Sequence, residues 1–472
     1  MKNSPTILVS RTDRAGDLIL TLPVFQILRA SLPNARIIAH VRSYTAPLLR
    51  GRHDVDEILI DPEPTSSRRA VSLSPQWGVN QPKPPVAGKS AMAGTRFSWV
   101  SGLRELVQKL RRADIDIAIL VHPAPRAIIA CAFARIPMRI GRASNFWQFF
   151  LTHRMVQHRS KNEKHEREYN LDLLAPLGSL FSSSSSLSPS HSPSPSHSPS
   201  PSPSPSHSTA FSLSSHSSSS FPPTSPSPTP TPTPALISFL SEAAFPLLQP
   251  TPEAINEGRR LLREAGFFPP LRMSGLPATG DFSTSAKLPG AYETSSAAQA
   301  SALPTSFQHP IAVHPGSGGS ANNLSPARYA GLVQNLLARG HAVFVTLGPG
   351  EEKIAGLFPV PQAGRFAIIS GLADLEIMAG LLSHAAAFIG GSTGPMHIAA
   401  ALGIPVAAVF PPRPSMTPRR WGPAGRNPIL ILTPEPTSEA CSGICRSCPR
   451  DPCLERLDLS PLFPWLEREG LW

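Results

Sequence analysis

The chain has 472 residues, with 43 Lys and Arg against 31 Asp and Glu, and with 56 Pro. This length exceeds a single typical core, so the sequence predicts two domains and additional segments that do not fold. No apolar run is long enough to span a bilayer, and the N-terminus lacks the features of a signal peptide, so the expected location is the cytoplasm. The net charge of +12 permits anionic partners without choosing among them.

Proline is concentrated in segments that lack hydrophobic periodicity. Residues 181–234 hold 25 Ser and 14 Pro and no Lys, Arg, Asp or Glu, so they are expected to form a disordered linker. This linker is either an inserted spacer, which we favour, or a phosphorylated or partner-binding arm. Residues 62–98 and 270–308 are expected to be disordered inserts. The predicted domains are therefore residues 1–180 and 235–472.

Short apolar runs alternate with amphipathic segments along the first domain. These runs predict buried strands at Ile7–Ser10, Arg36–Val41, Glu57–Ile60 and Ile115–Val121. The amphipathic segments predict helices at Leu18–Leu32, Trp99–Arg112 and Arg126–Ala134.

The same alternation continues in the second domain. Strands are predicted at Ile311–Val313, Ala342–Leu347, Phe366–Ile369, Ala386–Ile389 and Val406–Phe410. Helices are predicted near 326–339, 351–357, 374–383 and 394–402. The predicted fold class is α/β, with two Rossmann-like domains whose parallel sheets face each other across a cleft. Ligands bind such sheets at the carboxyl ends of the strands, which directs attention to the loops after Ser10, Val313 and Ile389.

The first of these loops ends in Gly16 and Asp17 at the start of a predicted helix. A carboxylate at this position is favoured by the helix dipole and can cap free N–H groups. Asp17 could instead lie in the cleft and accept a proton from a substrate hydroxyl. Asp13, on the same loop, is the competing candidate for that role. The residues alone leave capping and catalysis open.

Two loops of the second domain can present backbone N–H groups to an anion. The loop after Val313 supplies His314, Gly316, Ser317, Gly318 and Ser320. The loop after Ile389 supplies Ser392, Thr393, Gly394, Pro395, Met396 and His397. One such loop is a weak signal, but two on one sheet indicate a nucleotide diphosphate. Glu351 or Glu352 could bind a ribose hydroxyl, although a solvated carboxylate at a helix start is the plainer interpretation.

These motifs together resemble glycosyltransferase family 9, the bacterial lipopolysaccharide heptosyltransferases. The resemblance lies in residues 7–23, 165–178, 314–318, 371–412 and 420–423. It implies a GT-B architecture in which the first domain holds the acceptor and the second holds a nucleotide sugar. It also implies inverting transfer without a bound metal or other cofactor, with Asp17 as general base. The helix end at Thr393–His397 would then stabilise the departing diphosphate.

Two departures from the family pattern concern the donor. Many relatives carry a basic residue and then Trp where this chain has Asn322, Asn323 and Leu324. The phosphate charge must therefore be met by backbone donors, His397 or another basic residue. Ser392 stands where heptose-transferring members tend to have Asp, so the donor could be ADP-heptose or another ADP-, GDP- or UDP-sugar. The alternative function is a catalytically silent nucleotide-sugar binding or scaffold protein.

Basic residues on or near the first domain's loops could bind an anionic glycolipid, such as an inner-core lipopolysaccharide precursor, or form a solvated surface. These residues are Arg11, Arg14, Arg42, Arg126 and Arg142. Peripheral association with the cytoplasmic face of the inner membrane is expected through charge alone. A nucleic-acid partner is disfavoured, because no recognised binding module is present.

Four of the five cysteines cluster near the C-terminus, at Cys441, Cys445, Cys448 and Cys453. They could be free or redox-labile thiols, which we favour, a structural zinc site, or an iron–sulfur cluster. Cys131 stands alone on an apolar helix and is expected in the core.

Overall fold

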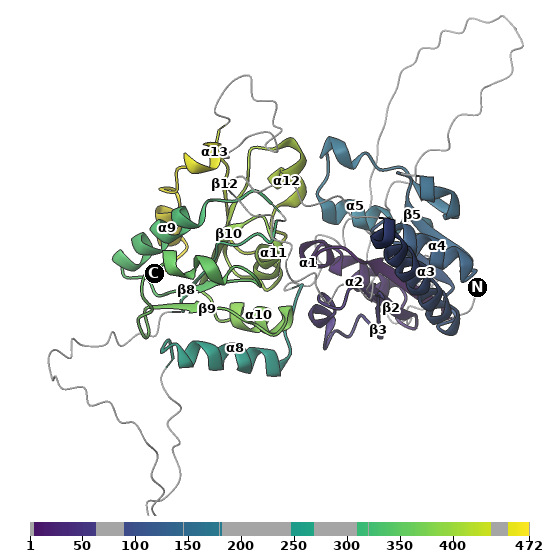
Figure 1. Ribbon diagram of the computed structural model, residues 1–472, viewed down its shortest axis with the longest axis horizontal. Coiled ribbons are helices and arrows are strands. Elements are labelled where there is room, and N and C mark those ends of the chain that lie inside the picture. Colours follow the sequence, from purple (N-terminus) through teal and green to yellow (C-terminus); the bar gives the residue numbers. More distant parts are fainter. Residues whose placement is uncertain are drawn as a thin grey trace, which may run out of the picture.

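The computed structural model describes residues 4–62, 89–144, 146–178, 180–181, 247–268, 309–319, 321–435 and 452–471. Residues 182–234 of the predicted linker and all of the predicted insert 270–308 lie outside this set. Two lobes are visible in Figure 1, one purple to blue from the first part of the chain and one green to yellow from the second.

The first lobe contains a six-stranded parallel sheet in the order β3-β2-β1-β4-β5-β6. Its strands are β1 (Thr6–Arg11), β2 (Arg36–Val41), β3 (Glu57–Ile60), β4 (Ile117–Leu120), β5 (Met138–Arg142) and β6 (His153–Met155). Ser10 of β1 pairs in register with His40 of β2 and Leu120 of β4. These central strands are buried on both faces, as a parallel sheet covered by helices requires.

The second lobe repeats this order as β9-β8-β7-β10-β11-β12. Its strands are β7 (Ile311–His314), β8 (Val343–Thr346), β9 (Phe366–Ile369), β10 (Ala387–Gly391), β11 (Val406–Val409) and β12 (Ile429–Leu432). Each sheet thus has Rossmann topology, and its strand order reverses between β1 and β4 or between β7 and β10. The predicted two-domain α/β fold is confirmed, and the three loops selected from the sequence follow strands at these switch points.

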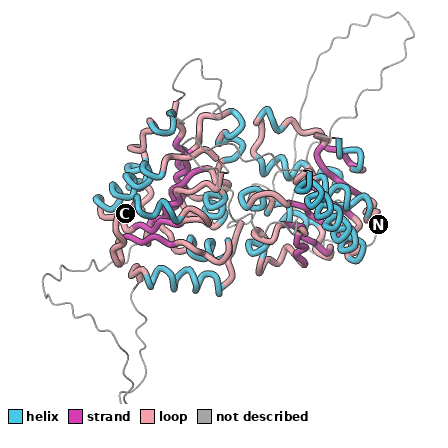
Figure 2. The backbone as a smooth tube through the Cα atoms, in the orientation of Figure 1, coloured by secondary structure: helices cyan, strands magenta, loops and turns pink. Residues whose placement is uncertain are grey.

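Helices cover both sheets (Figure 2). Those of the first lobe are α1 (Ala15–Ile19), α2 (Leu22–Ser31), α3 (Lys89–Arg112), α4 (Pro125–Phe133) and α5 (Glu166–Asp172). Those of the second are α8 (Pro252–Glu264), α9 (Pro326–Ala338), α10 (Leu375–Leu382), α11 (Gly394–Ala401), α12 (Pro418–Trp421), α13 (Pro452–Glu455) and α14 (Leu462–Arg468). The 3-10 helices are η1 (Ala46–Leu49), η3 (Phe146–Phe150), η4 (Arg159–Lys161), η5 (Ala175–Leu177), η6 (Glu352–Leu357) and η7 (Pro414–Met416). None of the described helices is long and apolar enough to cross a bilayer.

The predicted helix Leu18–Leu32 is two helices, α1 and α2, because of Pro23. Proline has no N–H for the carbonyl of Ile19, so α1 ends there. Pro23 instead lies in the first turn of α2, where the missing N–H costs nothing. This break makes α1 a short helix whose N-terminal turn carries Asp17.

Several other elements differ from expectation. Helix α3 begins at Lys89, so the last ten residues of the predicted insert 62–98 are helical. That stretch contains no Pro, and its Ala, Met and Lys are good helix formers. The predicted helix at 351–357 is the 3-10 helix η6. Strands β5, β6 and β12 and helix α8 were missed, although the apolar run of β12 and the Thr251 cap of α8 were readable signals.

Apolar packing joins the two lobes. One hydrophobic cluster extends from β1, α1 and α2 to α10 and α11 of the second lobe. The opposite faces of the two sheets are covered by α3 and α4 in one lobe and by α9 and α14 in the other. Cys131 is buried as predicted, and burial raises its pKa to about 12. Helices α1 and α11 therefore meet at the centre of Figure 1, where the two switch points face each other.

Candidate active site

A pocket of about 640 Å³, including space open to solvent, lies between the two lobes. The first lobe lines it with Arg14, Gly16 and Asp17. The second lobe lines it with Ser392, Thr393, Gly394, His397, Ser415, Met416 and Trp421. The structure thus brings the loop after β1 and the loop after β10 to one pocket.

Asp17 is the third residue of α1, but it does not serve as a helix cap. Its carboxylate accepts a hydrogen bond from the Arg11 guanidinium. Its side chain is 16% exposed and reaches the pocket. The carboxylate is therefore held by a buried cation and remains accessible from the cleft.

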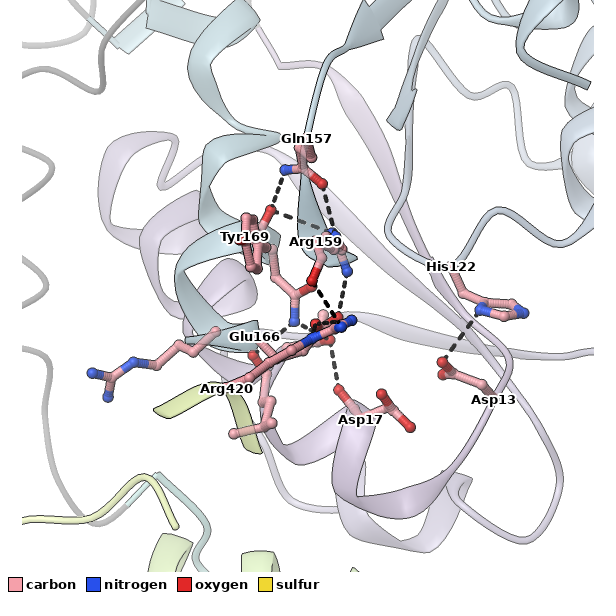
Figure 3. Close-up of polar contacts among 12 residues, drawn as sticks. Asp13, Asp17, His122, Gln157, Arg159, Glu166, Tyr169 and Arg420 are labelled. Carbon is pink, nitrogen blue, oxygen red and sulfur yellow. Dashed lines mark hydrogen bonds and ion pairs between the residues drawn. The ribbon is translucent and has the colours of Figure 1, made fainter. Parts of the chain in front are cut away.

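Asp13, the competing candidate, is held in a different electrostatic environment. Burial pushes the pKa of Asp13 upward, but the charges of Arg11 and His122 outweigh burial and lower it below the usual value. His122 Nδ1 lies 3.2 Å from the Asp13 carboxylate (Figure 3). Burial raises the pKa of Asp17 above its usual value; Asp13 and Glu166 raise it further, and Arg11 opposes the shift without cancelling it. Asp17 is thus the stronger base of the two, and Asp13 does not line the pocket.

Arg11 does not lie on the surface that the sequence analysis assigned to an acceptor. It is 3% exposed, and its guanidinium donates to Asp13 at 2.8 Å and to Asn170 at 3.3 Å as well as to Asp17. Asn170 on α5 in turn donates to the carbonyl of Leu20 at 3.0 Å. Arg11 is therefore a buried positioning residue for Asp17, because strand β1 ends beneath helices α1 and α5.

Glu166 connects this buried cation to the second lobe (Figure 3). The Glu166 carboxylate binds Arg159 and lies 3.8 Å from Arg11. Its other oxygen accepts from Arg420, at the end of α12, at 3.1 Å. Arg420 also donates to the carbonyl of Arg159 at 3.0 Å. A continuous set of charges thus runs from the second lobe through Glu166 and Arg11 to Asp17.

His165 adds a neutral contact between the same segments. Its Nδ1 accepts from the backbone of Arg167, and its Nε2 lies 3.0 Å from the carbonyl of Gly422, so Nε2 carries the proton. Burial lowers the pKa of His165. The segments 165–178 and 420–423 carried the family resemblance, yet the sequence reasoning gave them no role. The structure brings them together beside the pocket.

The N-terminus of α11 is the part of the site that lacks capping groups. Thr393 is the N-cap residue, but its hydroxyl donates to the carbonyl of Gly391 and caps no N–H group. Thr393 and Gly394 line the pocket, where an anion would satisfy the free N–H groups at this helix end. Pro395 lies in the first turn as predicted. Met396 is fully buried in the hydrophobic cluster and does not line the pocket.

His397 cannot supply the positive charge that the sequence analysis considered for it. Burial, aided by the nearby His165, lowers its pKa to about 3. The ring is therefore neutral, and its buried Nδ1 has no hydrogen-bond partner among the described residues. A side chain at Gly16 would place its Cβ only 2.6 Å from Cδ2 of His397. The absence of a side chain at Gly16 thus allows α1 to pack against α11.

The loop after β7 differs from the prediction that it cradles phosphate. The carboxylate of Glu351 accepts from the N–H of Gly348 at 2.8 Å and from that of Gly318 at 3.4 Å. A Cβ at Gly316 would lie within 2.2 Å of this carboxylate. The protein's own anion thus occupies the loop, so a phosphate there would meet repulsion. None of the described residues of this loop lines the pocket.

The remaining donor-site candidates are placed as follows. His314 is buried, its Nδ1 lies 2.9 Å from the hydroxyl of Thr346, and burial lowers its pKa. Ser317 is half-buried and Glu352 is exposed, while Ser320 lies outside the described residues. The Asn323 side chain donates to the carbonyl of Pro315 at 3.1 Å, so it stabilises the loop after β7.

The basic residues predicted for the acceptor fall into two groups. Arg14 and Arg42 are exposed, and Arg42 donates to the carbonyl of Thr12 at 2.7 Å. Arg126 is half-buried and paired with Asp61, which also lies 3.2 Å from His40. Arg142 is half-buried with its Nε buried and unpartnered among the described groups, and burial lowers its pKa. Arg14 is thus the described cation that lines the pocket.

The cysteine cluster lies largely outside the described residues. Cys453, at the start of α13, is buried. Cys441, Cys445 and Cys448 are not described, so the choice among thiols, zinc and an iron–sulfur cluster stays a prediction. No group of metal-binding side chains is found among the residues that the structure covers.

Known proteins resemble this chain in sequence and in fold. Residues 249–447 match the family model "Glycosyltransferase family 9 (heptosyltransferase)". A Haemophilus influenzae protein named "Putative glycosyltransferase" is 27% identical over 426 residues, which are 88% of this chain and 85% of the relative. A solved family 9 glycosyltransferase from Veillonella parvula is 15% identical with a TM-score of 0.60, covering 100% and 99% of the two chains. E. coli ADP-heptose lps heptosyltransferase II is also 15% identical, with a TM-score of 0.55 and 99% of both chains covered.

The two facing Rossmann-like domains, with the pocket between them, give this chain the GT-B fold of these solved structures. With the sequence matches to the second domain and to most of the chain, this protein is a glycosyltransferase that resembles family 9.

Proposed function

We propose that the protein transfers a sugar, with inversion and without a metal ion, from a nucleotide diphosphate sugar to a hydroxyl of a lipopolysaccharide-core or related glycan. The observation that supports this proposal is that Asp17 and the uncapped N-terminus of α11 line the same pocket. One supplies a base and the other an anion site, on opposite walls. These are the two groups that a single displacement at an anomeric carbon requires.

In the proposed reaction, Asp17 accepts the proton of the acceptor hydroxyl as that oxygen attacks the anomeric carbon. The bond between the anomeric carbon and the diphosphate oxygen breaks, and the negative charge moves onto the diphosphate. The N–H groups at Thr393 and Gly394, together with the Arg14 guanidinium, stabilise that charge. Attack from the face opposite the leaving group inverts the anomeric configuration.

The donor is assigned to the second domain, with its diphosphate at α11 and its nucleoside over the loops after β7 and β8. Glu351 lies at those loops, where its carboxylate can accept from a ribose hydroxyl while it keeps its N–H partners. Glu352 is exposed and makes the weaker candidate. ADP-heptose is the donor in the name of the E. coli structural relative, and we propose it as the first donor to test.

The acceptor is assigned to the first domain, on the Asp17 side of the pocket. Arg14 and Arg42 are the exposed cations beside that wall, which suits an anionic glycolipid. We therefore propose that the protein works in the cytoplasm, at the cytoplasmic face of the inner membrane.

Thermal shift with ADP, GDP and UDP and with their sugars identifies the donor, because a ligand that binds the folded state stabilises it. Transfer assays with the stabilising donor follow, with and without EDTA, and the anomeric configuration of the product is read by NMR. We expect stabilisation by one nucleotide, EDTA-resistant transfer and inversion. A fold that no nucleotide stabilises, or a product with retained configuration, would contradict the proposal.

A further inference from the structure

The short helix η3 exposes aromatic side chains at the edge of the first sheet. Phe146 and Phe149 are 69% and 63% exposed, the highest values among the described aromatic residues. Their rings contact each other edge to face at 5.7 Å, and Trp147 contacts Phe146 and stacks on Phe150. We call Phe146, Trp147, Phe149 and Phe150 the aromatic patch. A solvent-exposed cluster of large aromatic rings costs free energy unless something covers it.

The surroundings of the aromatic patch carry positive charge. Residues 117–162 contain six Arg and one Lys but neither Asp nor Glu; of these cations, Arg126, Arg159 and Lys161 pair with carboxylates outside this stretch. The exposed Arg154 guanidinium lies over the Phe149 ring, 5.4 Å from its centroid. Arg135 is exposed too, and Arg139 donates to the carbonyl of Phe150 at 2.7 Å, which fixes the end of η3 to β5. The patch is therefore a rigid aromatic surface beside cations.

The connection of η3 to β5 relates the patch to the pocket. The patch begins four residues after Arg142, at the carboxyl end of β5. The charge of Arg142 interacts with Glu166, Arg420 and Arg11 of the network behind Asp17. A partner that covers the aromatic patch would therefore lie at the carboxyl edge of the first sheet, the edge that also carries Asp17.

We propose that the aromatic patch docks the protein on an anionic phospholipid surface. Aromatic rings are favoured at the level of lipid headgroups, where their apolar faces leave water without entering the hydrocarbon core. Arg135 and Arg154 would face negatively charged headgroups at the same time. Docking by rings and charges together differs from the attachment by charge alone that the sequence predicted. This proposal goes beyond sugar transfer. Its test does not depend on which nucleotide sugar is the donor.

The test is flotation of the full-length protein with vesicles of phosphatidylglycerol and phosphatidylethanolamine, compared with vesicles of phosphatidylcholine alone. We expect binding to the anionic vesicles only. The double variant Phe146→Ser and Phe149→Ser should lose about tenfold or more in partitioning, and Arg154→Gln about fivefold. Val360→Ser is the matched control, because Val360 is 87% exposed on the second lobe. Its partitioning should equal that of the original chain.

A second readout locates the contact on η3. Vesicles with brominated acyl chains should quench part of the tryptophan fluorescence, and Trp147→Phe should abolish that part. Thermal shift by the donor nucleotide should stay unchanged in every patch variant, which separates this proposal from the proposed function. Equal flotation of the Phe146→Ser and Phe149→Ser variant, or no flotation of the original chain, would overturn the proposal. Patch-dependent dimerisation or oligonucleotide binding without flotation would overturn it in favour of a protein or nucleic-acid surface.

Discussion

The loop after β1 and the loop after β10 lie at equivalent switch points of two sheets with the same strand order. The first loop carries charge: Asp13, Asp17 and the buried Arg11 beneath them. The second loop carries no charged side chain, and its helix begins without a side-chain cap. The same topology thus presents a base on one wall of the pocket and bare N–H groups on the other.

The loop after β7 shows why topology alone does not determine which loop receives an anion. It is as rich in glycine as the loop after β10, but Glu351 folds back onto it. A loop against which a carboxylate lies, bonded to the N–H of Gly318, has less to offer a phosphate. The difference between these two loops therefore supports the proposal that the diphosphate binds at the N-terminus of α11.

The largest expected effect comes from Asp17, on the wall of the pocket that the loop after β1 and helix α1 form. Asp17→Asn should reduce kcat about 10³-fold, because the base is lost while the shape is kept. Nucleotide binding should be unchanged, since this substitution on α1 leaves the N-terminus of α11 untouched. Because burial raises the pKa of Asp17, its charge costs stability at neutral pH, so the variant should unfold at the same temperature or higher. Steady-state kinetics measure kcat, isothermal titration calorimetry measures nucleotide binding, and scanning calorimetry measures the unfolding temperature.

Asp13→Asn is the control for that comparison. Asp13 lies outside the pocket lining and pairs with Arg11 and His122. Its substitution should lower kcat about tenfold, through the position of Arg11. A loss at Asp13 as large as that at Asp17 would transfer the role of base to Asp13.

The next effect tests the contact between the two walls. Gly16→Ala places a methyl group against His397, which should separate α1 from α11 and reduce kcat/KM about 10- to 100-fold. The cost in the free energy of unfolding should be about 1–3 kcal/mol, as for other overpacked contacts. Gly331→Ala is the matched control, because a Cβ at Gly331 in α9 meets nothing within 4 Å. That variant should keep full activity, and an equally active Gly16→Ala would show that the walls need not touch.

Much of this architecture could be predicted from the sequence, because alternating strand and helix patterns determine a parallel sheet and its switch points. The contacts within the candidate site were harder to predict from the sequence. Nothing near Arg11 shows that Glu166 and Asn170, about 150 residues later, will bury it. The neutrality of His397 likewise depends on packing between domains. Strand β6 is short and its first two residues are exposed, so it lacks the apolar pattern that identified the central strands.

A smaller effect on ligand binding is expected at Glu351, whose carboxylate lies against the loop after β7. Glu351→Gln should weaken nucleotide binding about five- to tenfold, the value of one charge-assisted hydrogen bond to ribose. It should leave the affinity for inorganic pyrophosphate unchanged or higher, since a negative charge is removed. Glu352→Gln is the control and should change neither affinity. Isothermal titration calorimetry measures both ligands, and unchanged nucleotide binding in Glu351→Gln would remove Glu351 from the proposed ribose site.

The smallest expected effect concerns the pH dependence of kcat/KM, which Asp17 should control. Because the pKa of Asp17 is raised, mainly by burial, the acid limb of kcat/KM should lie above the pH at which an ordinary aspartate titrates. Asp17 is active when deprotonated, so activity is lost as the pH falls through that pKa. Glu166 raises the pKa of Asp17, so Glu166→Gln should move the acid limb to lower pH, with little change in kcat/KM at the optimum. Glu163→Gln, an exposed neighbour, should leave the profile unchanged. A limb that moves upward in Glu166→Gln would mean that Glu166 acts on Asp17 through the position of Arg11 and not through its charge.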